Sequence, residues 1–149
     1  MRKLVVLLAA AAAALVLATP AGAAVQRFHA EMSGSQETPM SGDRNGSGSA
    51  DLRLDRARGR VCFTIRVSGI DNVVASHIHR GGRGVAGSIV VDLITEPTEG
   101  RRFTGCNENV KGSLIRQIAR NPRGFYVNVH TEDFPGGAVR GQVRKGSHS

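Results

Sequence analysis

Aromatic side chains are scarce in this chain of 149 residues: tryptophan is absent, and Phe and Tyr together make up 4%. A hydrophobic core must therefore rest on Val, Ile, Leu and the five Phe residues. No stretch interleaves aromatic and basic residues as a nucleic-acid stacking surface does, which argues against a nucleic-acid partner. The chain has no G-x-x-x-x-G-K-[ST] motif, and no G-x-G-x-x-G motif stands between a strand and a helix. A nucleotide-binding α/β fold is therefore not expected.

A long apolar run occurs only at the N-terminus. Arg2 and Lys3 precede the apolar residues 4–17, and Ala21-Gly22-Ala23 has the small-residue pattern of a cleavage site. The run is short for a membrane span, which needs about 20 apolar residues. We therefore interpret residues 1–23 as a cleaved export signal, the alternative being an N-terminal membrane anchor.

The mature chain is expected to be one domain without a transmembrane segment, secreted or otherwise placed outside the cytoplasm. Removing the first 23 of 149 residues leaves 126, a length that suits a single hydrophobic core. The domain is expected to span residues 24–145, with residues 146–149 as a disordered tail. Composition does not indicate an oligomeric state.

Cysteine occurs only twice, as Cys62 and Cys106. An even number of cysteines in an exported protein predicts a disulfide. Free thiols or a thiolate metal ligand are the alternatives.

Positive charge is in excess. The whole chain has a formal charge of +8, and the loss of Arg2 and Lys3 with the signal would leave +6. Such an excess favours anionic partners such as wall polymers, acidic polysaccharides or phospholipid headgroups. The alternative is a solvated basic surface without a specific partner.

Short segments of alternating polarity, separated by Gly, Pro, Asn and Asp, predict an all-β fold. One helix is expected between Asn109 and Arg120, capped by Ser113 and ending before Pro122. This pattern is typical of an antiparallel β-sandwich or a partly closed Greek-key barrel. The predicted strands are Phe28–Met32, Ala50–Leu54, Val61–Val67, Val73–His79, Ile89–Ile94, Phe125–His130 and Ala138–Arg144.

Two strand ends carry histidine and are followed by glycine-rich turns. Side chains alternate along a strand, so His77 and His79 share one face, as do Tyr126, Asn128 and His130. If those faces meet, three imidazoles converge, a donor set that suits Zn²⁺ or Cu²⁺. A copper–zinc superoxide dismutase also carries an H-x-H strand on a Greek-key barrel, but this chain lacks the further histidines of a dinuclear site. Copper or zinc is therefore the candidate cofactor, and the fold requires none.

The alternative for the same histidines is a buried polar network that fixes the strand register without a ligand. Glu37 in this network would hydrogen-bond turn amides or pair with Arg140, rather than act as an acid or base. No catalytic residues are identified, because the chain lacks a G-x-S-x-G turn. We therefore do not expect an enzyme, while metal-dependent redox chemistry remains an alternative. The expected network residues besides the histidines are Glu37, Asn128, Thr131, Arg140 and Gln142.

Three segments together resemble the CHRD (chordin) domain family, in a form with one exported domain. They are Phe28-His-Ala-Glu-Met-Ser-Gly34 with Glu37-Thr-Pro39, then Ala75-Ser-His-Ile-His-Arg-Gly81, then Gly124–Thr131 with Pro135–Gln142. The resemblance implies an immunoglobulin-like or related β fold and an extracytoplasmic setting, and it carries no established activity. We therefore expect a non-catalytic binding or structural module at the cell surface or outside the cell, whose partner is an unidentified protein. The alternatives are a Cu²⁺- or Zn²⁺-binding protein using His77, His79 and His130, and a binder of anionic surface polymers.

Overall fold

The computed structural model describes residues 24–146, so the expected signal at 1–23 and the last three residues lie outside the described part. Gly146, expected as the first residue of the tail, donates its backbone N–H to the Arg27 carbonyl at 3.0 Å. The elements are β1 Gln26–Ser33, η1 Gly34–Gln36, β2 Ser47–Asp55, β3 Arg60–Ser68, β4 Val73–Arg80, β5 Ile89–Ile94, β6 Arg102–Asn107, α1 Gly112–Arg120, η2 Pro122–Gly124, β7 Phe125–Thr131, β8 Val139–Gln142 and β9 Arg144–Lys145.

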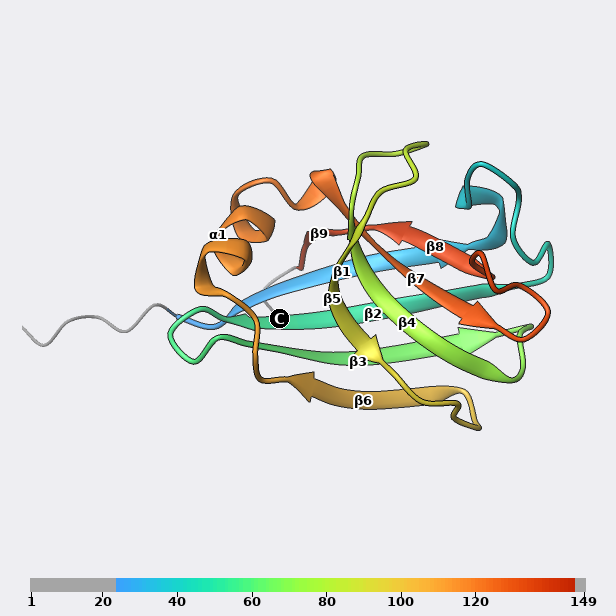
Figure 1. The fold of residues 1–149 in the computed structure, drawn as a ribbon, viewed down its shortest axis with the longest axis horizontal. Helices are drawn as coiled ribbons and strands as arrows, with labels where there is room; N and C mark the ends of the chain where they lie inside the picture. Colours follow the sequence, from blue (N-terminus) through green and yellow to red (C-terminus); the bar gives the residue numbers. More distant parts are fainter. Residues whose placement is uncertain (1–23, 147–149) are drawn as a thin grey trace, which may run out of the picture.

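The strands form one antiparallel sheet in the order β5-β4-β7-β8-β1-β2-β3-β6, with β9 paired to β1. The sheet curls until its edge strands approach each other, where the Asn107 side-chain amide donates to the Asp92 carbonyl at 3.1 Å. Figure 1 shows the resulting barrel, with α1 at one end. The predicted all-β class with one short helix is confirmed, in the form of a nearly closed barrel.

Alternation of side chains builds the core. In β2, Ala50, Leu52 and Leu54 are at most 1% exposed, whereas Asp51 and Arg53 between them face solvent. The neighbouring strands β1 and β3 contribute buried residues in the same alternation. The barrel interior is therefore filled by aliphatic side chains and a few Phe residues, as the scarcity of aromatics required.

Helix α1 buries Ile115 and Ile118 in this core. It begins at Gly112 with Lys111 as the N-cap residue and without a side-chain cap, so the predicted capping role of Ser113 was wrong. Ser113 lies inside the first turn. No helix of residues 24–146 is long and apolar enough to cross a membrane.

Two features of the sheet departed from the predictions. Strand β6 was missed because Phe103 is its one buried hydrophobic residue, and a polar segment without alternation gives no strand signal. The single strand expected at Ala138–Arg144 is divided into β8 and β9, because the Val143 N–H donates to the Phe125 carbonyl of β7 at 3.0 Å.

A disulfide joins β3 to the edge strand β6, where Cys62 and Cys106 stand directly opposite each other. The two residues are 44 positions apart in the sequence. The bond therefore holds β6 at the seam of the barrel, where this strand buries only Phe103.

Replacing both Cys62 and Cys106 by Ser should lower the free energy of unfolding by about 4 kcal/mol, since a cross-link closing a loop of this length restricts the unfolded chain. Denaturant unfolding without reductant measures the effect. Reductant should destabilise the wild type to a similar extent and leave the variant unchanged. Equal stability of wild type and variant, with thiols that react in the native wild type, would contradict the disulfide.

Candidate metal centre

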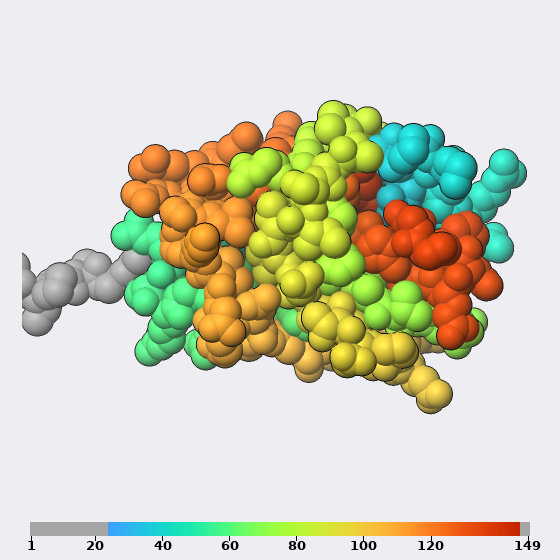
Figure 2. Space-filling view, in the orientation of Figure 1, coloured from blue at the N-terminus to red at the C-terminus, as the bar shows by residue number. Residues whose placement is uncertain are grey.

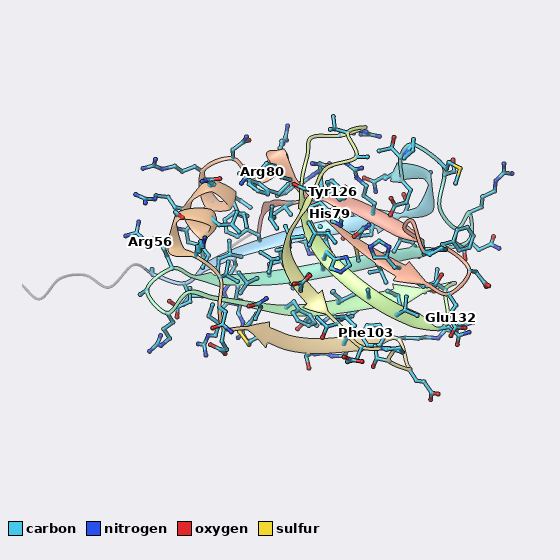
Figure 3. All side chains as sticks on the ribbon, viewed as in Figure 1. Arg56, His79, Arg80, Phe103, Tyr126 and Glu132 are labelled. Atoms are coloured by element: carbon cyan, nitrogen blue, oxygen red, sulfur yellow. A yellow bond between two sulfur atoms is a disulfide. The ribbon has the colours of Figure 1, made fainter. Side chains whose placement is uncertain are left out.

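The register between β4 and β7 brings the two histidine-bearing segments together. His77 stands opposite Asn128, and His79 stands opposite Tyr126. Ser76 and Ile78 are fully buried at 0% exposure and face the core, so the histidines take the outer face of the sheet. Figure 3 shows His79 and Tyr126 on this side of the barrel, midway between its ends.

Two loops, 81–88 and 132–138, cover this outer face and contact the histidine rings through the Gly87 and Pro135 carbonyls. The loop 81–88 folds back on the end of β4, where the Arg80 N–H donates to the Ser88 carbonyl at 2.9 Å. Gly87 allows this close approach, because a Cβ at its position would overlap the Arg80 carbonyl. In the two glycine-rich turns, Gly84 and Gly137 adopt positive φ, whereas Gly87 does not. Close backbone approach explains Gly87 better than backbone freedom does.

Ring nitrogens of three histidines converge under these loops. One nitrogen from each of His77, His79 and His130 lies within 4.8 Å of the others. The shortest approach joins His77 Nδ1 and His130 Nε2 at 3.1 Å. The structure therefore brings together the three predicted ligands. Glu132 and Asp133, which follow His130 closely in the sequence, do not belong to the cluster.

Backbone carbonyls orient two of the rings. His79 Nδ1 lies 2.8 Å from the Gly87 carbonyl, and His130 Nδ1 lies 2.9 Å from the Pro135 carbonyl. A carbonyl only accepts hydrogen bonds, so each Nδ1 carries the proton and each Nε2 presents a lone pair to the cluster. His79 Nε2 is buried and has no hydrogen-bond partner among the described residues.

His77 connects the cluster to a carboxylate. Because His130 Nε2 carries a lone pair, His77 Nδ1 donates to it when no metal is present. On its other side, His77 Nε2 lies 3.8 Å from Asp92 Oδ1. If the proton moved to Nε2, it would face this carboxylate and free Nδ1 as a ligand. His79 and His130 therefore have an outer hydrogen-bond acceptor, the arrangement that orients histidine ligands in metal sites, while Asp92 lies near His77 Nε2 without a direct hydrogen bond.

Burial favours the neutral form of two of these imidazoles, His77 and His130. Burial lowers the pKa of His77 to about 4, and the neighbouring His130 and His79 act in the same direction. Burial also lowers the pKa of His130, against the opposing hydrogen bond to Pro135. Neutral imidazole is the form that binds metal, so little proton competition is expected at neutral pH.

Tyr126 supports the cluster in a way the sequence did not predict. Its ring stacks on His79 with centroids 4.8 Å apart, and the guanidinium carbon of Arg140 lies 3.4 Å from its centroid. Arg140 is 1% exposed, and its Nη2 donates to the Gly82 and Val85 carbonyls at 2.9 Å each. The buried arginine therefore fastens the covering loop and packs against the ring that positions His79.

The other expected network residues differ in what they contact. The Gln142 amide donates to the Gly81 carbonyl at 2.8 Å, and Thr131 Oγ1 accepts from the Phe134 N–H at 3.1 Å. Asn128 Oδ1 and Glu37 Oε1 are buried without a hydrogen-bond partner in the described chain. Arg140, Gln142 and Thr131 thus fasten loops to strands, and Glu37 accepts a hydrogen bond from the backbone of Thr38.

Glu37 packs against Gly137, where a Cβ would approach its carboxylate to 2.5 Å. The expected ion pair with Arg140 is not formed within 4.0 Å in the described structure. Burial raises the pKa of Glu37 to about 7, although Arg140 and a hydrogen bond from the Thr38 backbone act against the increase. The native state consequently favours the protonated carboxyl group.

Since the native pKa of Glu37 is raised from 4.5 to about 7, its contribution to stability is complete below pH 4.5 and is lost as the pH rises through 7. Glu37→Gln should remove this loss, which amounts to no more than about 3 kcal/mol. Urea unfolding at pH 5 and pH 8 should therefore show the variant gaining stability relative to wild type at the higher pH. Glu99→Gln is the matched control, and an equal difference at both pH values would contradict the assignment.

The fold and this cluster together define a class of protein: a nearly closed antiparallel β barrel with a loop-covered group of three histidines on its outer face. The CHRD domain model matches residues 28–143, which are most of the chain, so the chain belongs to the CHRD domain family. The resemblance read from the motifs is thereby confirmed. No curated protein and no solved structure matches the chain.

Proposed function

We propose that this CHRD domain is an exported, non-catalytic module that binds one Cu²⁺ or Zn²⁺ ion through His77, His79 and His130. The observation that carries the proposal is the convergence of three ring nitrogens within 4.8 Å. The basic and apolar residues before Ala21-Gly22-Ala23 support export, as does the disulfide.

The donor set fits a borderline transition metal. Neutral imidazoles suit Zn²⁺ and Cu²⁺, whereas Ca²⁺ and Mg²⁺ take oxygen ligands. In this arrangement His79 and His130 bind through Nε2 and His77 through Nδ1. The Gly87 and Pro135 carbonyls hold the opposite nitrogens of His79 and His130, and Asp92 Oδ1 lies 3.8 Å from His77 Nε2. Three protein ligands leave a fourth position for water or another small ligand.

A purely structural role explains less of the geometry. In a polar network that served only to fix strand register, each buried ring nitrogen would be expected to find a partner, since an unsatisfied buried group costs about 1–3 kcal/mol. His79 Nε2 has none among the described residues, and His79 contributes a ring nitrogen to the cluster. A bound cation accounts for this nitrogen directly.

Metal titration of the chain from Ala24 onward, without an affinity tag, tests the proposal. Calorimetry should show one ion per chain, with the affinity reduced by more than about 100-fold in His77→Ala, His79→Ala and His130→Ala. His29→Ala is the matched control, because His29 lies on β1 and contacts Glu31 and Asp51 at 2.6 and 2.8 Å, away from the cluster. Absence of stoichiometric binding, or an equal loss in His29→Ala, would overturn the metal site.

Asp92 should act as a positioning residue for His77. Asp92→Asn keeps the shape of the side chain and removes the charge opposite His77 Nε2, so metal affinity should fall by about 10–100-fold while binding stays stoichiometric. In the copper-loaded protein, the electron paramagnetic resonance spectrum should retain its nitrogen couplings. An unchanged affinity would contradict the role of Asp92.

A further inference from the structure

One end of the barrel concentrates positive charge. This basic pole is formed by the β2–β3 turn and by the segment 108–124 that contains α1, and Figure 2 shows the two side by side at the end of the molecule. Its carboxylates are Asp55, which is buried and lies 2.9 Å from Arg58, and Glu108, which lies 3.7 Å from Arg60. The basic residues of the pole are Arg56, Arg58, Arg60, Lys111, Arg116, Arg120 and Arg123.

Most of this charge is not neutralised within the domain. Among residues 24–146, none of Arg56, Lys111, Arg116, Arg120 and Arg123 has an ion-pair partner within 4.0 Å, and all five are exposed. Arg116 and Arg120 are four residues apart on α1, a spacing at which like charges repel. An external anion at this pole would relieve that repulsion.

The opposite end of the barrel carries the negative charge. Besides Glu37, whose raised pKa favours the protonated form, its loops contain six of the 12 carboxylates of the chain, with Arg44 and Arg101 as the basic residues among them. The six are Asp43, Asp71, Glu96, Glu99, Glu132 and Asp133. Figure 3 shows Arg56 and Glu132 at opposite ends of the molecule. The domain is therefore polarised along the barrel, and an anionic surface would attract one end and repel the other.

A groove in the basic pole combines charge with an apolar floor. Arg56, Arg116 and Arg120 line a cavity of about 220 Å³, together with Leu54, Ile115 and Ala119. A hydrated polysaccharide has no need of such a floor. A phospholipid offers a phosphate for the guanidinium groups and a glycerol and acyl region for the apolar residues.

We propose that the basic pole docks on an anionic phospholipid membrane, with lipid phosphates held by Arg56, Arg116 and Arg120. The course of the chain favours a membrane over other anionic surfaces. Ala24 lines the same groove, so the chain enters the domain at this pole, shortly after the apolar residues 4–17 in the sequence. This step rests on the export proposed above: while residues 4–17 are attached as an export signal, the membrane that receives them lies next to the basic pole. Docking by this pole leaves the histidine face on the side of the barrel free.

Vesicle co-sedimentation tests the docking with the chain from Ala24 to Ser149, which contains every described residue. Binding is expected to vesicles of equal phosphatidylcholine and phosphatidylglycerol, not to phosphatidylcholine alone, and it should weaken as salt is raised. The double variant Arg116→Gln/Arg120→Gln should bind about 30-fold more weakly. Arg44→Gln/Arg83→Gln removes the same charge from exposed sites outside the pole and should bind like wild type.

Circular dichroism and thermal unfolding establish that both double variants are folded. Three results would overturn the proposal: no binding to phosphatidylglycerol vesicles, an equal loss in the two double variants, or binding to a soluble acidic polysaccharide without binding to vesicles. The first two would mean that the pole is not a lipid site. The third would make the domain a polymer binder. The metal site is tested separately, because none of the substituted arginines lies in the histidine cluster.

Discussion

The candidate site depends on the antiparallel register between β4 and β7. In this register His77 pairs with Asn128 and His79 pairs with Tyr126. The β4 histidines therefore lie beside His130 on one outer face of the sheet. Side chains in a strand alternate with a period of two, so a slip of one residue would turn His77 and His79 into the barrel and expose Ile78. The aliphatic core opposes that slip, because Ile78 is fully buried. The hydrophobic interior thereby fixes the position of a polar site that it does not contain.

Covering loops change the chemistry of that face. An exposed imidazole would titrate near neutral pH, but burial under the loops lowers the pKa of His77 to about 4 and keeps the ring neutral. The same loops supply the carbonyls that select the tautomers of His79 and His130. Arg140 fastens one of these loops from beneath. Fold stability and ligand geometry are therefore linked through a few backbone carbonyls.

The metal site and the basic pole occupy different parts of one rigid scaffold. The first lies on the side of the barrel and depends on burial, neutrality and hydrogen-bond direction. The second lies at one end and depends on exposed, unpaired charge that long-range electrostatics can use. A barrel suits this division, because its curved sheet presents outer faces and ends that are independent of one another.

The sequence by itself determined the strands with regular alternation, such as Ala50–Leu54, and the common face of His77 and His79, because both follow from the local geometry of an extended chain. It also determined the family, through motifs that keep their order and spacing. Only the tertiary structure decided that β6 closes the barrel, that Tyr126 stacks on His79, and that Glu37 stays apart from Arg140. These features depend on which distant segments meet and how tightly loops cover them. Long-range packing determines the distances between these side chains and excludes water around them. Neither property can be read from the polar–apolar periodicity of a single segment.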